Sequence, residues 1–192
     1  MALNVRLAER VRGLRAARGL TLDALAERSG VSRSMISLVE RGESSPTAVV
    51  LERLSVGLGV TLASLFEFER ESVSPLVRRA EQTVWRDPET GYVRRNLSPP
   101  RFDTPIELVE VEFPPGERIA FDSGPRSIGV DQQVWVLDGV IELTLGEETY
   151  RLERGDCLAM RLGPPISFHN PGAGPARYLV ALTAEDRARA HR

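Results

Sequence analysis

The chain has 192 residues, of which 42% are hydrophobic and 27% charged, a composition typical of a globular protein with one large or two small domains. Its longest apolar stretch without a charge, residues 54–66, is too short to cross a bilayer, and the N-terminus reaches a charge at Arg6 without the apolar region of a secretory signal. With a single cysteine, Cys157, this pattern predicts a cytoplasmic protein without membrane association.

The charges and prolines divide the chain into two unlike parts. Residues 1–66 hold nine arginines and six acidic residues, a net charge of +3, whereas residues 67–192 hold 16 arginines and 21 acidic residues, a net charge of −5. Of the 13 prolines, only Pro46 precedes residue 70. We therefore expect two domains of different fold class, residues 1–66 and 78–192, joined by a charged linker at 67–77. Only the basic first domain is expected to meet a polyanion.

The first 66 residues have the periodicity of a five-helix, all-α domain. Apolar residues recur at helical spacing from Leu3 to Leu14, and a glycine follows each of the first three expected helices. A last helical turn is expected at residues 61–66. Three residues can cap the N-termini of the second to fourth helices: Thr21, Ser32 and Thr47.

The helices on either side of Gly30 are predicted to form a helix-turn-helix, whose second helix can enter the major groove of DNA. Burial of Ile36 and Val39 would turn the opposite face of this helix outward. Arginine can hold guanine through two hydrogen bonds, serine can bond to base edges, and leucine can meet the thymine methyl group. The helix N-terminus that follows offers amides to phosphate. The predicted DNA-binding residues are Thr21, Ser32, Arg33, Ser34, Ser37, Leu38, Arg41, Ser44 and Thr47.

Residues 6–66 resemble the XRE (Cro-type) helix-turn-helix family. The resemblance is carried by an ungapped series of motifs that includes Gly19-Leu-Thr-Leu, Leu25-Ala, Ser29-Gly-Val-Ser and Glu40-Arg-Gly. It implies that Arg15 pairs with Glu40 in a structural role, and that Arg33, Ser34 and Leu38 contact bases with Thr21 near the backbone. The alternative is a helical bundle that docks another protein, as in some antitoxin or adaptor modules. An arginine and a serine exposed at the start of the helix favour DNA.

The second domain shows short strand-like runs separated by turn signals, which predict an all-β barrel or jelly roll. These runs are residues 107–113, 133–137, 140–145, 149–152, 157–160 and 177–182. Over about residues 105–183 the chain resembles the cupin family, on the motifs Leu137-Asp-Gly, Arg154-Gly-Asp and His169-Asn-Pro-Gly. An XRE domain followed by a cupin is a recurring architecture of bacterial transcriptional regulators, so the resemblance implies a C-terminal cupin sensor domain.

Metal-dependent cupins hold their ion with three histidines and a glutamate. Here the glutamate position holds Gln132, the third histidine position holds Ile166, and the other two fall around residues 125–128, which contain no histidine. His169, three residues past the third position, is expected at the surface or rim. The resemblance also includes mononuclear-iron oxidoreductases with an accessory helix-turn-helix, but their chemistry needs the ligands that this chain lacks. We therefore predict no enzyme, no metal and no cofactor.

A barrel without a metal is expected to bind a small organic effector, with Arg161 or Arg126 holding a carboxylate or phosphate. The alternative is that its own side chains fill the barrel, which then only dimerises. Trp85 and Trp135 are candidates for packing either at an interface or in the core. Cys157 is expected to be a small buried apolar residue and Asp156 to close a turn. The predicted effector-binding residues are Gln132, Val134, Arg161, Ile166 and Phe168.

Together these features predict a homodimeric transcriptional regulator. Its two helix-turn-helix domains would bind a palindromic operator with half-sites about 34 Å apart. An effector in the cupin domain would change the spacing or mobility of these DNA-binding heads.

Overall fold

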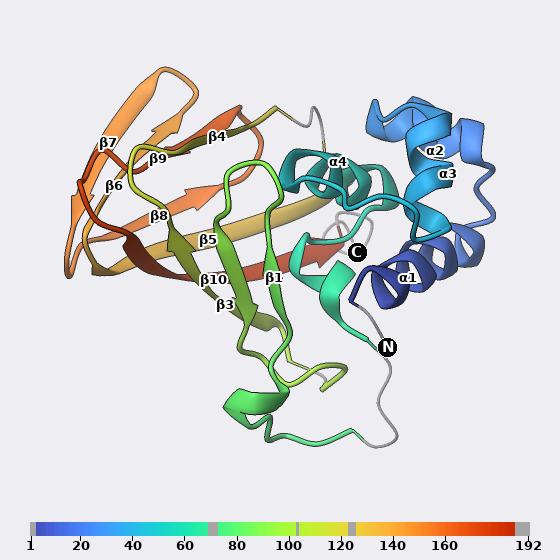
Figure 1. Cartoon of the computed structure of the whole chain (residues 1–192), viewed down its shortest axis with the longest axis horizontal. Helices are drawn as coiled ribbons and strands as arrows, with labels where there is room; N and C mark the ends of the chain where they lie inside the picture. Colours follow the sequence, from blue (N-terminus) through green and yellow to red (C-terminus); the bar gives the residue numbers. More distant parts are fainter. Residues whose placement is uncertain (1–2, 69–72, 103, 123–125, 187–192) are drawn as a thin grey trace.

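The computed structural model describes residues 3–68, 73–102, 104–122 and 126–186 as a helical domain docked on a β-barrel (Figure 1). The predicted linker therefore lies partly outside the described residues. The helical domain consists of α1 (Leu3–Ala17), α2 (Leu22–Ser29), α3 (Arg33–Glu40), α4 (Ala48–Leu58) and the 3-10 turn η1 (Ala63–Phe66).

The expectation of five α-helices is wrong, because the described residues form four and the fifth is only η1. The Thr61 hydroxyl caps this turn at 3.1 Å from the Ser64 amide, and the Glu67 amide bonds to the Ser64 carbonyl, three residues back. Bonds of this spacing close the tighter 3-10 turn instead of an α-helix.

The three predicted helix caps are confirmed. The hydroxyls of Thr21, Ser32 and Thr47 accept hydrogen bonds from the backbone amides three residues further on, at 3.0, 3.2 and 3.4 Å. Gly30 ends α2 in the left-handed conformation with a φ of 65°, which favours glycine because it has no Cβ. The sharp connection between α2 and α3 follows from this cap and this glycine.

The barrel consists of two antiparallel sheets that enclose a shared interior. The six-stranded sheet has the order β1-β2-β3-β10-β5-β8, and the four-stranded sheet has the order β4-β9-β6-β7. The strands are β1 (Val84–Arg86), β2 (Val93–Asn96), β3 (Ile106–Phe113), β4 (Arg118–Phe121), β5 (Ile128–Asp138), β6 (Val140–Leu145), β7 (Glu148–Glu153), β8 (Cys157–Arg161), β9 (Ile166–His169) and β10 (Ala176–Asp186). A second 3-10 turn, η2 (Arg79–Glu81), precedes β1.

Each of the six strand-like runs predicted from the sequence lies within one of the longer strands, β3, β5, β6, β7, β8 or β10. The strands β1, β2 and β4 were not predicted because each has only three or four residues and includes arginine. Such short segments carry too little alternation to be recognised before their partners are known.

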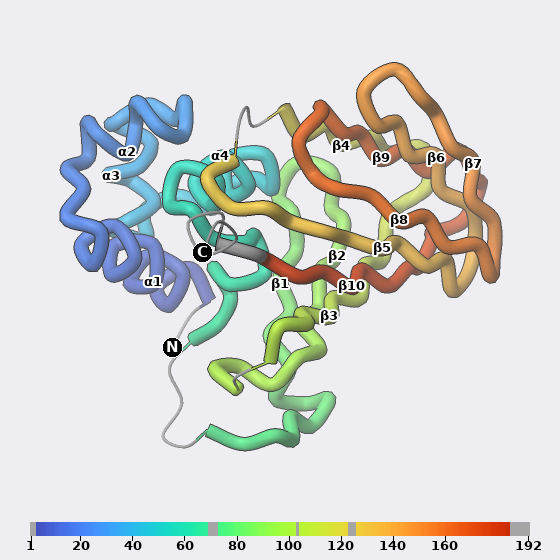
Figure 2. Tube along the Cα trace, turned by 180° about the vertical axis from the view of Figure 1, so that it is seen from behind, coloured from blue at the N-terminus to red at the C-terminus, as the bar shows by residue number. Residues whose placement is uncertain are grey.

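The two domains share one hydrophobic core. Phe66 of η1 packs on Trp85 of β1, which packs on Tyr92 and through it on Phe113, with ring centroids 5.6–5.7 Å apart at each step. Helix α4 lies between the other helices and the barrel, and both views show it against the barrel (Figures 1 and 2). Trp85 is thus a core residue and not an interface residue. Among the described residues, no helix is both long and apolar enough to span a membrane.

Candidate functional site

Helix α3 presents an exposed polar face beside a deeply buried one. Ser32, Arg33 and Ser34 are exposed at its N-terminal end, whereas Ile36 and Val39 are at most 2% exposed in the core. The Arg33 side chain is 63% exposed and lies 3.1 Å from the carboxylate of Asp23 on α2. An exposed ion pair of this kind contributes little energy. Arg33 is therefore able to leave Asp23 for a stronger partner.

The family-implied pair of Arg15 and Glu40 is present as a double hydrogen bond between a half-buried arginine and a buried glutamate. The guanidinium of Arg15 donates to both carboxylate oxygens of Glu40, at 2.6 and 2.7 Å, and also to the Leu20 carbonyl at 2.9 Å. The hydrogen bond to Glu40 raises the pKa of Arg15 above its ordinary value. This pair joins α1 to the end of α3 and sets the orientation in which α3 presents its exposed face.

Apart from the caps Thr21 and Thr47, the remaining predicted DNA contacts lie in the C-terminal half of α3 or after its end. Ser37 and Leu38 are half-buried, and the Ser37 hydroxyl accepts a hydrogen bond from Arg41, which also pairs with Glu43 through two bonds of 2.8 Å. The hydroxyl of Ser44 points at the sulfur of Met35, 3.9 Å away. The residues from Ser32 to Ser44 thus lie along one helix and the loop that follows it.

The N-terminus of α4 holds an anion from the barrel, which corrects the expectation that its amides meet phosphate. Asp87, in the turn between β1 and β2 and only 1% exposed, accepts a hydrogen bond of 2.8 Å from the backbone amide of Ala48. Its second oxygen accepts bonds from the amide and hydroxyl of Thr90. A carboxylate is favoured at this end of a helix, where free amides and the helix dipole are positive. Thr47 is half-buried beside it.

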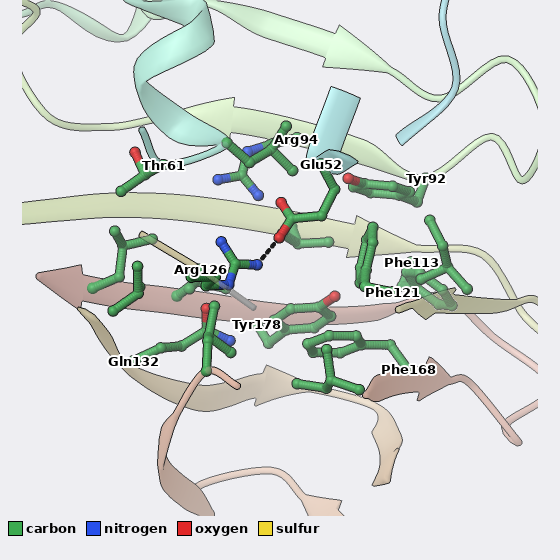
Figure 3. Close-up of a pocket in the computed structure, with 18 residues that line it drawn as sticks. Glu52, Thr61, Tyr92, Arg94, Phe113, Phe121, Arg126, Gln132, Phe168 and Tyr178 are labelled. Atoms are coloured by element: carbon green, nitrogen blue, oxygen red, sulfur yellow. Dashed lines mark hydrogen bonds and ion pairs between the residues drawn. The ribbon is translucent and has the colours of Figure 1, made fainter. Parts of the chain in front are cut away.

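The interior of the barrel contains a cavity of about 80 Å³, closed at one end by the helical domain (Figure 3). Residues from α4 and its C-terminal connection line it together with residues from β2, β3, β4, β5, β9 and β10. The lining residues are Glu52, Thr61, Leu62, Tyr92, Arg94, Val111, Phe113, Ile119, Phe121, Arg126, Val130, Gln132, Leu162, Ile166, Phe168, Tyr178, Val180 and Leu182.

Three of the five predicted effector-binding residues, Gln132, Ile166 and Phe168, line this cavity, and two do not. Val134 is fully buried on the inner face of β5 and is covered by its neighbours. Arg161 lies on the outer face, where it bonds to both carboxylate oxygens of Asp131 at 2.8 and 2.6 Å. Its prediction was wrong because strand alternation places its neighbour Met160 on the inner face of β8.

Three charged side chains face the cavity, and they come from different elements (Figure 3). Glu52 of α4 forms an ion pair with Arg126, which precedes β5, and each of these two side chains is only 8% exposed. Burial lowers the pKa of Arg126. Arg94 of β2 is also 8% exposed, and its Nε has no hydrogen-bond partner among the described residues. The cavity therefore has two guanidinium groups and one carboxylate.

Two phenols complete the polar lining. Burial raises the pKa of Tyr92 to about 12 and raises that of Tyr178 further still. Both phenols therefore stay neutral at physiological pH. Each can act as a hydrogen-bond donor or acceptor in an otherwise apolar interior.

Of the three charged residues that line the cavity, only Arg126 was predicted from the sequence. Glu52 was missed because a glutamate on an amphipathic helix is normally solvated, and only the docking of α4 on the barrel places it at the cavity. Arg94 was missed because β2 itself was not expected. The alternating apolar residues of β3 and β10 could have indicated the apolar part of the cavity lining. Val111 and Phe113 project to one face of β3, and Tyr178 and Val180 project to one face of β10.

The residues of the cavity do not fit the mononuclear metal centre of metal-dependent cupins. Gln132 and Ile166 occupy two of the expected ligand positions, and the guanidinium groups of Arg94 and Arg126 would repel a cation. His169 lies outside the cavity, with its ring nitrogen 2.9 Å from Glu142. Within the part of the chain that the structure describes, no group of three histidine, cysteine or acidic side chains is placed to hold an ion.

Two smaller expectations concern the loop between β7 and β8 and its surroundings. Asp156 closes the turn as predicted, because its side chain accepts a hydrogen bond of 2.9 Å from the Glu153 amide. The prediction that Cys157 is buried is wrong, since Cys157 is exposed and pairs in register with Trp135 on the outer face of the sheet.

Comparison with known proteins matches both domains to families. Residues 11–65 match the family described as Helix-turn-helix, and residues 109–182 match the family described as Cupin domain. The HTH-type transcriptional regulator SutR of Escherichia coli (strain K12) is 30% identical over 166 residues, which cover 86% of this chain and 88% of SutR. The chain belongs to the HTH-type transcriptional regulators.

Two further relatives show the same assignment to the HTH-type transcriptional regulators. The HTH-type transcriptional regulator PuuR of E. coli (strain K12) is 27% identical over 179 residues, covering 91% of the regulator and 93% of PuuR. Among solved structures, an HTH_3 family transcriptional regulator from Vibrio cholerae is 25% identical with a TM-score of 0.77, covering 94% of this chain and 96% of that one. The arrangement of a helix-turn-helix domain followed by a cupin barrel is thus shared along nearly the whole length of the regulator.

Proposed function

We propose that this regulator binds an operator in the cytoplasm through α3, as a homodimer, and that a small molecule in the cupin cavity controls this binding. The DNA-binding part rests on the exposure of Ser32, Arg33 and Ser34 at the start of α3. The opposite face of this helix is packed in the core, and the pair of Arg15 and Glu40 fixes its C-terminal end. These side chains suit base edges and phosphates.

The alternative that α3 docks a protein has less support from its surface. Protein interfaces are rich in aromatic and large apolar residues at their centre. The exposed end of α3 carries two serines and an arginine instead, and its only large apolar residue facing outward, Leu38, is half-buried. Such a surface is better suited to the polar edges of a DNA groove.

A fluorescence-anisotropy titration tests the DNA-binding part. The regulator is titrated at fixed salt against its own upstream DNA and against a scrambled duplex of the same composition. We expect selective binding to the upstream DNA, and we expect Arg33→Ala to lose about 1–3 kcal/mol of it with relaxed base preference. The matched control is Arg151→Ala, which removes an exposed arginine from β7 of the barrel. Equal losses on both duplexes would show that Arg33 contacts only phosphate.

The homodimer places two copies of α3 about one helical turn of DNA apart. We propose the outer face of the six-stranded sheet as the contact between copies, because Trp135 is 47% exposed there. Its register partners Cys157 and Leu179 extend the same face.

Light scattering is expected to give a dimer for the regulator and a monomer for Trp135→Ser. A bismaleimide on Cys157, the single cysteine, should cross-link the two copies. A dimer with unchanged stability in Trp135→Ser would place the contact elsewhere.

The proposal that the barrel senses a small molecule rests on the cavity itself. The barrel is not completely filled by its own side chains, and polar groups converge on the space that remains. Because Glu52 and Thr61 of the helical domain form part of the lining, a ligand there touches both domains. The same features, with Gln132 and Ile166 where metal ligands would stand, favour a sensor over an iron oxidoreductase. Release of operator DNA by members of a metabolite panel, followed by anisotropy, tests this part.

A further inference from the structure

The charged side chains that line the cavity are unbalanced. Arg94 and Arg126 contribute two positive charges and Glu52 contributes one negative charge, and all three side chains are more than nine-tenths buried. A buried charge without a full set of partners is costly, because the surrounding protein replaces water poorly. The lining therefore favours a ligand that brings one further negative charge.

Arg94 is the clearest sign of a missing group. Its Nε donor lies inside the protein with no acceptor among the described residues, although its guanidinium also interacts with the Tyr92 phenol and the Glu107 carboxylate. Arginine presents its donors as a planar fork that matches the two oxygens of a carboxylate. A buried arginine with a free donor beside an open cavity is thus suited to receive an anionic oxygen.

Arg126 already holds a carboxylate, but this carboxylate belongs to the helical domain. Glu52 reaches it from α4, and Figure 3 shows the pair among the residues that line the cavity, pointing toward one another. A ligand anion that enters the cavity is chemically equivalent to the Glu52 carboxylate and can take its place at Arg126. The contact between α4 and the barrel then loses its ion pair.

The size and the walls of the cavity restrict the rest of the ligand. Its volume of about 80 Å³ is roughly half of the 150 Å³ that accommodates benzene in an engineered protein cavity. Its walls near Phe121, Phe168 and Tyr178 are aromatic, and Ile166 and Leu182 add aliphatic surface. These features suit a short apolar chain with a single anionic head, which occupies the space of the Glu52 carboxylate that it replaces at Arg126.

We propose that the cavity binds a small organic carboxylate whose head bonds to Arg94 and displaces Glu52 from Arg126. This inference rests on the proposed role of the barrel as a sensor and gives that sensor its ligand class and its switch. Because Glu52 stands on α4, ligand binding and the position of the DNA-binding head are coupled through one ion pair. Such coupling is reciprocal, so operator DNA must change the affinity for the carboxylate by the same factor.

The test compares three compounds of nearly equal size and different charge: butyrate, butyramide and butylamine. Calorimetric titration and the thermal unfolding midpoint are measured with the full chain at constant ionic strength and millimolar ligand. We expect butyrate to bind and to raise the midpoint, and the other two to do neither. Inorganic phosphate is the additional arm that distinguishes recognition of a carboxylate from recognition of any anion. Equal binding of butyrate and butyramide, or preferential binding of butylamine or phosphate, would overturn the proposal.

Variants locate the binding. Arg126→Gln is expected to weaken butyrate binding about tenfold or more, because a charge-assisted hydrogen bond is lost. Glu52→Gln is expected to strengthen it by a similar factor of about ten, because the internal competitor loses its charge. The matched control Arg161→Gln, on the outer face of the barrel, should leave binding unchanged. Should Arg126→Gln fail to fold, the Glu52→Gln variant decides alone, because weaker binding in it would contradict displacement.

The last arm adds operator DNA. In the unaltered regulator butyrate should change operator affinity, and in Glu52→Gln this change should be reduced severalfold because the ion pair is already absent. If carboxylates do not bind while neutral or cationic metabolites release the operator, this inference fails and the proposed function stands. If the operator itself is not bound selectively, the proposed function fails while carboxylate binding remains measurable by calorimetry.

Discussion

Two buried pairs of arginine and glutamate connect elements of this regulator, and they have different surroundings. Arg15 and Glu40 lie within the helical domain, and the guanidinium has a further acceptor in the Leu20 carbonyl. Arg126 and Glu52 lie between the domains, beside a cavity and a second guanidinium, Arg94. The first pair, with its Glu40 side chain only 7% exposed, holds α3 in place. The second has an open space next to it in which a competing anion fits. The surroundings, and not the pair itself, separate a structural contact from an exchangeable one.

The largest effect is expected from Arg15→Met, which leaves Glu40 charged and buried without a partner. Removing one member of a buried ion pair is strongly destabilising. We expect the free energy of unfolding to fall by about 3 kcal/mol, measured by urea titration of the full chain. Arg18→Met is the matched control just after the end of the same helix. The Arg18 side chain is exposed and donates to the Leu14 carbonyl, so its loss is expected to cost less than about 0.5 kcal/mol. Equal losses of unfolding free energy in the two variants would show that the pair of Arg15 and Glu40 does not stabilise the fold more than an exposed arginine does.

A smaller effect is expected from Arg126→Met. Glu52 then lacks its partner, but Arg94 lines the same cavity and the carboxylate can turn toward it. We expect a loss of about 1 kcal/mol in the free energy of unfolding, less than the usual cost of breaking a buried pair. A loss as large as that of Arg15→Met would mean that the pair between the domains is as structural as the one within the helical domain.

The smallest expected effect is a change in how the stability of the protein depends on pH, and it concerns another contact between the domains. Glu107 of β3 accepts a hydrogen bond from Thr61, and burial, assisted by repulsion from Glu67, raises its pKa above the ordinary value. The folded protein therefore binds this proton more strongly than the unfolded chain. The resulting stability is full below the ordinary pKa and is lost as the pH rises through the raised pKa.

Glu107→Gln keeps an oxygen that can accept the Thr61 bond and removes the titration. We expect the variant to gain stability relative to the unaltered protein as the pH rises through that window. Thermal unfolding of both proteins across the acidic to neutral range measures the difference. A difference that does not change with pH would show that Glu107 is not responsible.

The sequence predicted the helical domain better than the cavity, for physical reasons. Caps such as Ser32 and the buried face of α3 depend on neighbours a few residues away, so their pattern is readable locally. Arg161 shows the limit in the barrel, where an error of one residue in a strand reverses inside and outside. Glu52 and Asp87 show a further limit. Their partners lie 74 and 39 residues away, and only the docking of the two domains brings them together.

The hydrogen bond from Ala48 to Asp87 has a consequence for synthesis of the protein. The helical domain emerges from the ribosome before residue 87 does, so its α4 can form first without the carboxylate that later meets its N-terminus. Trp85, which covers Phe66, arrives at the same stage. The nascent helical domain therefore reaches its final stability only when the β1–β2 hairpin has emerged, so that folding of the first domain is completed only as the barrel begins to form.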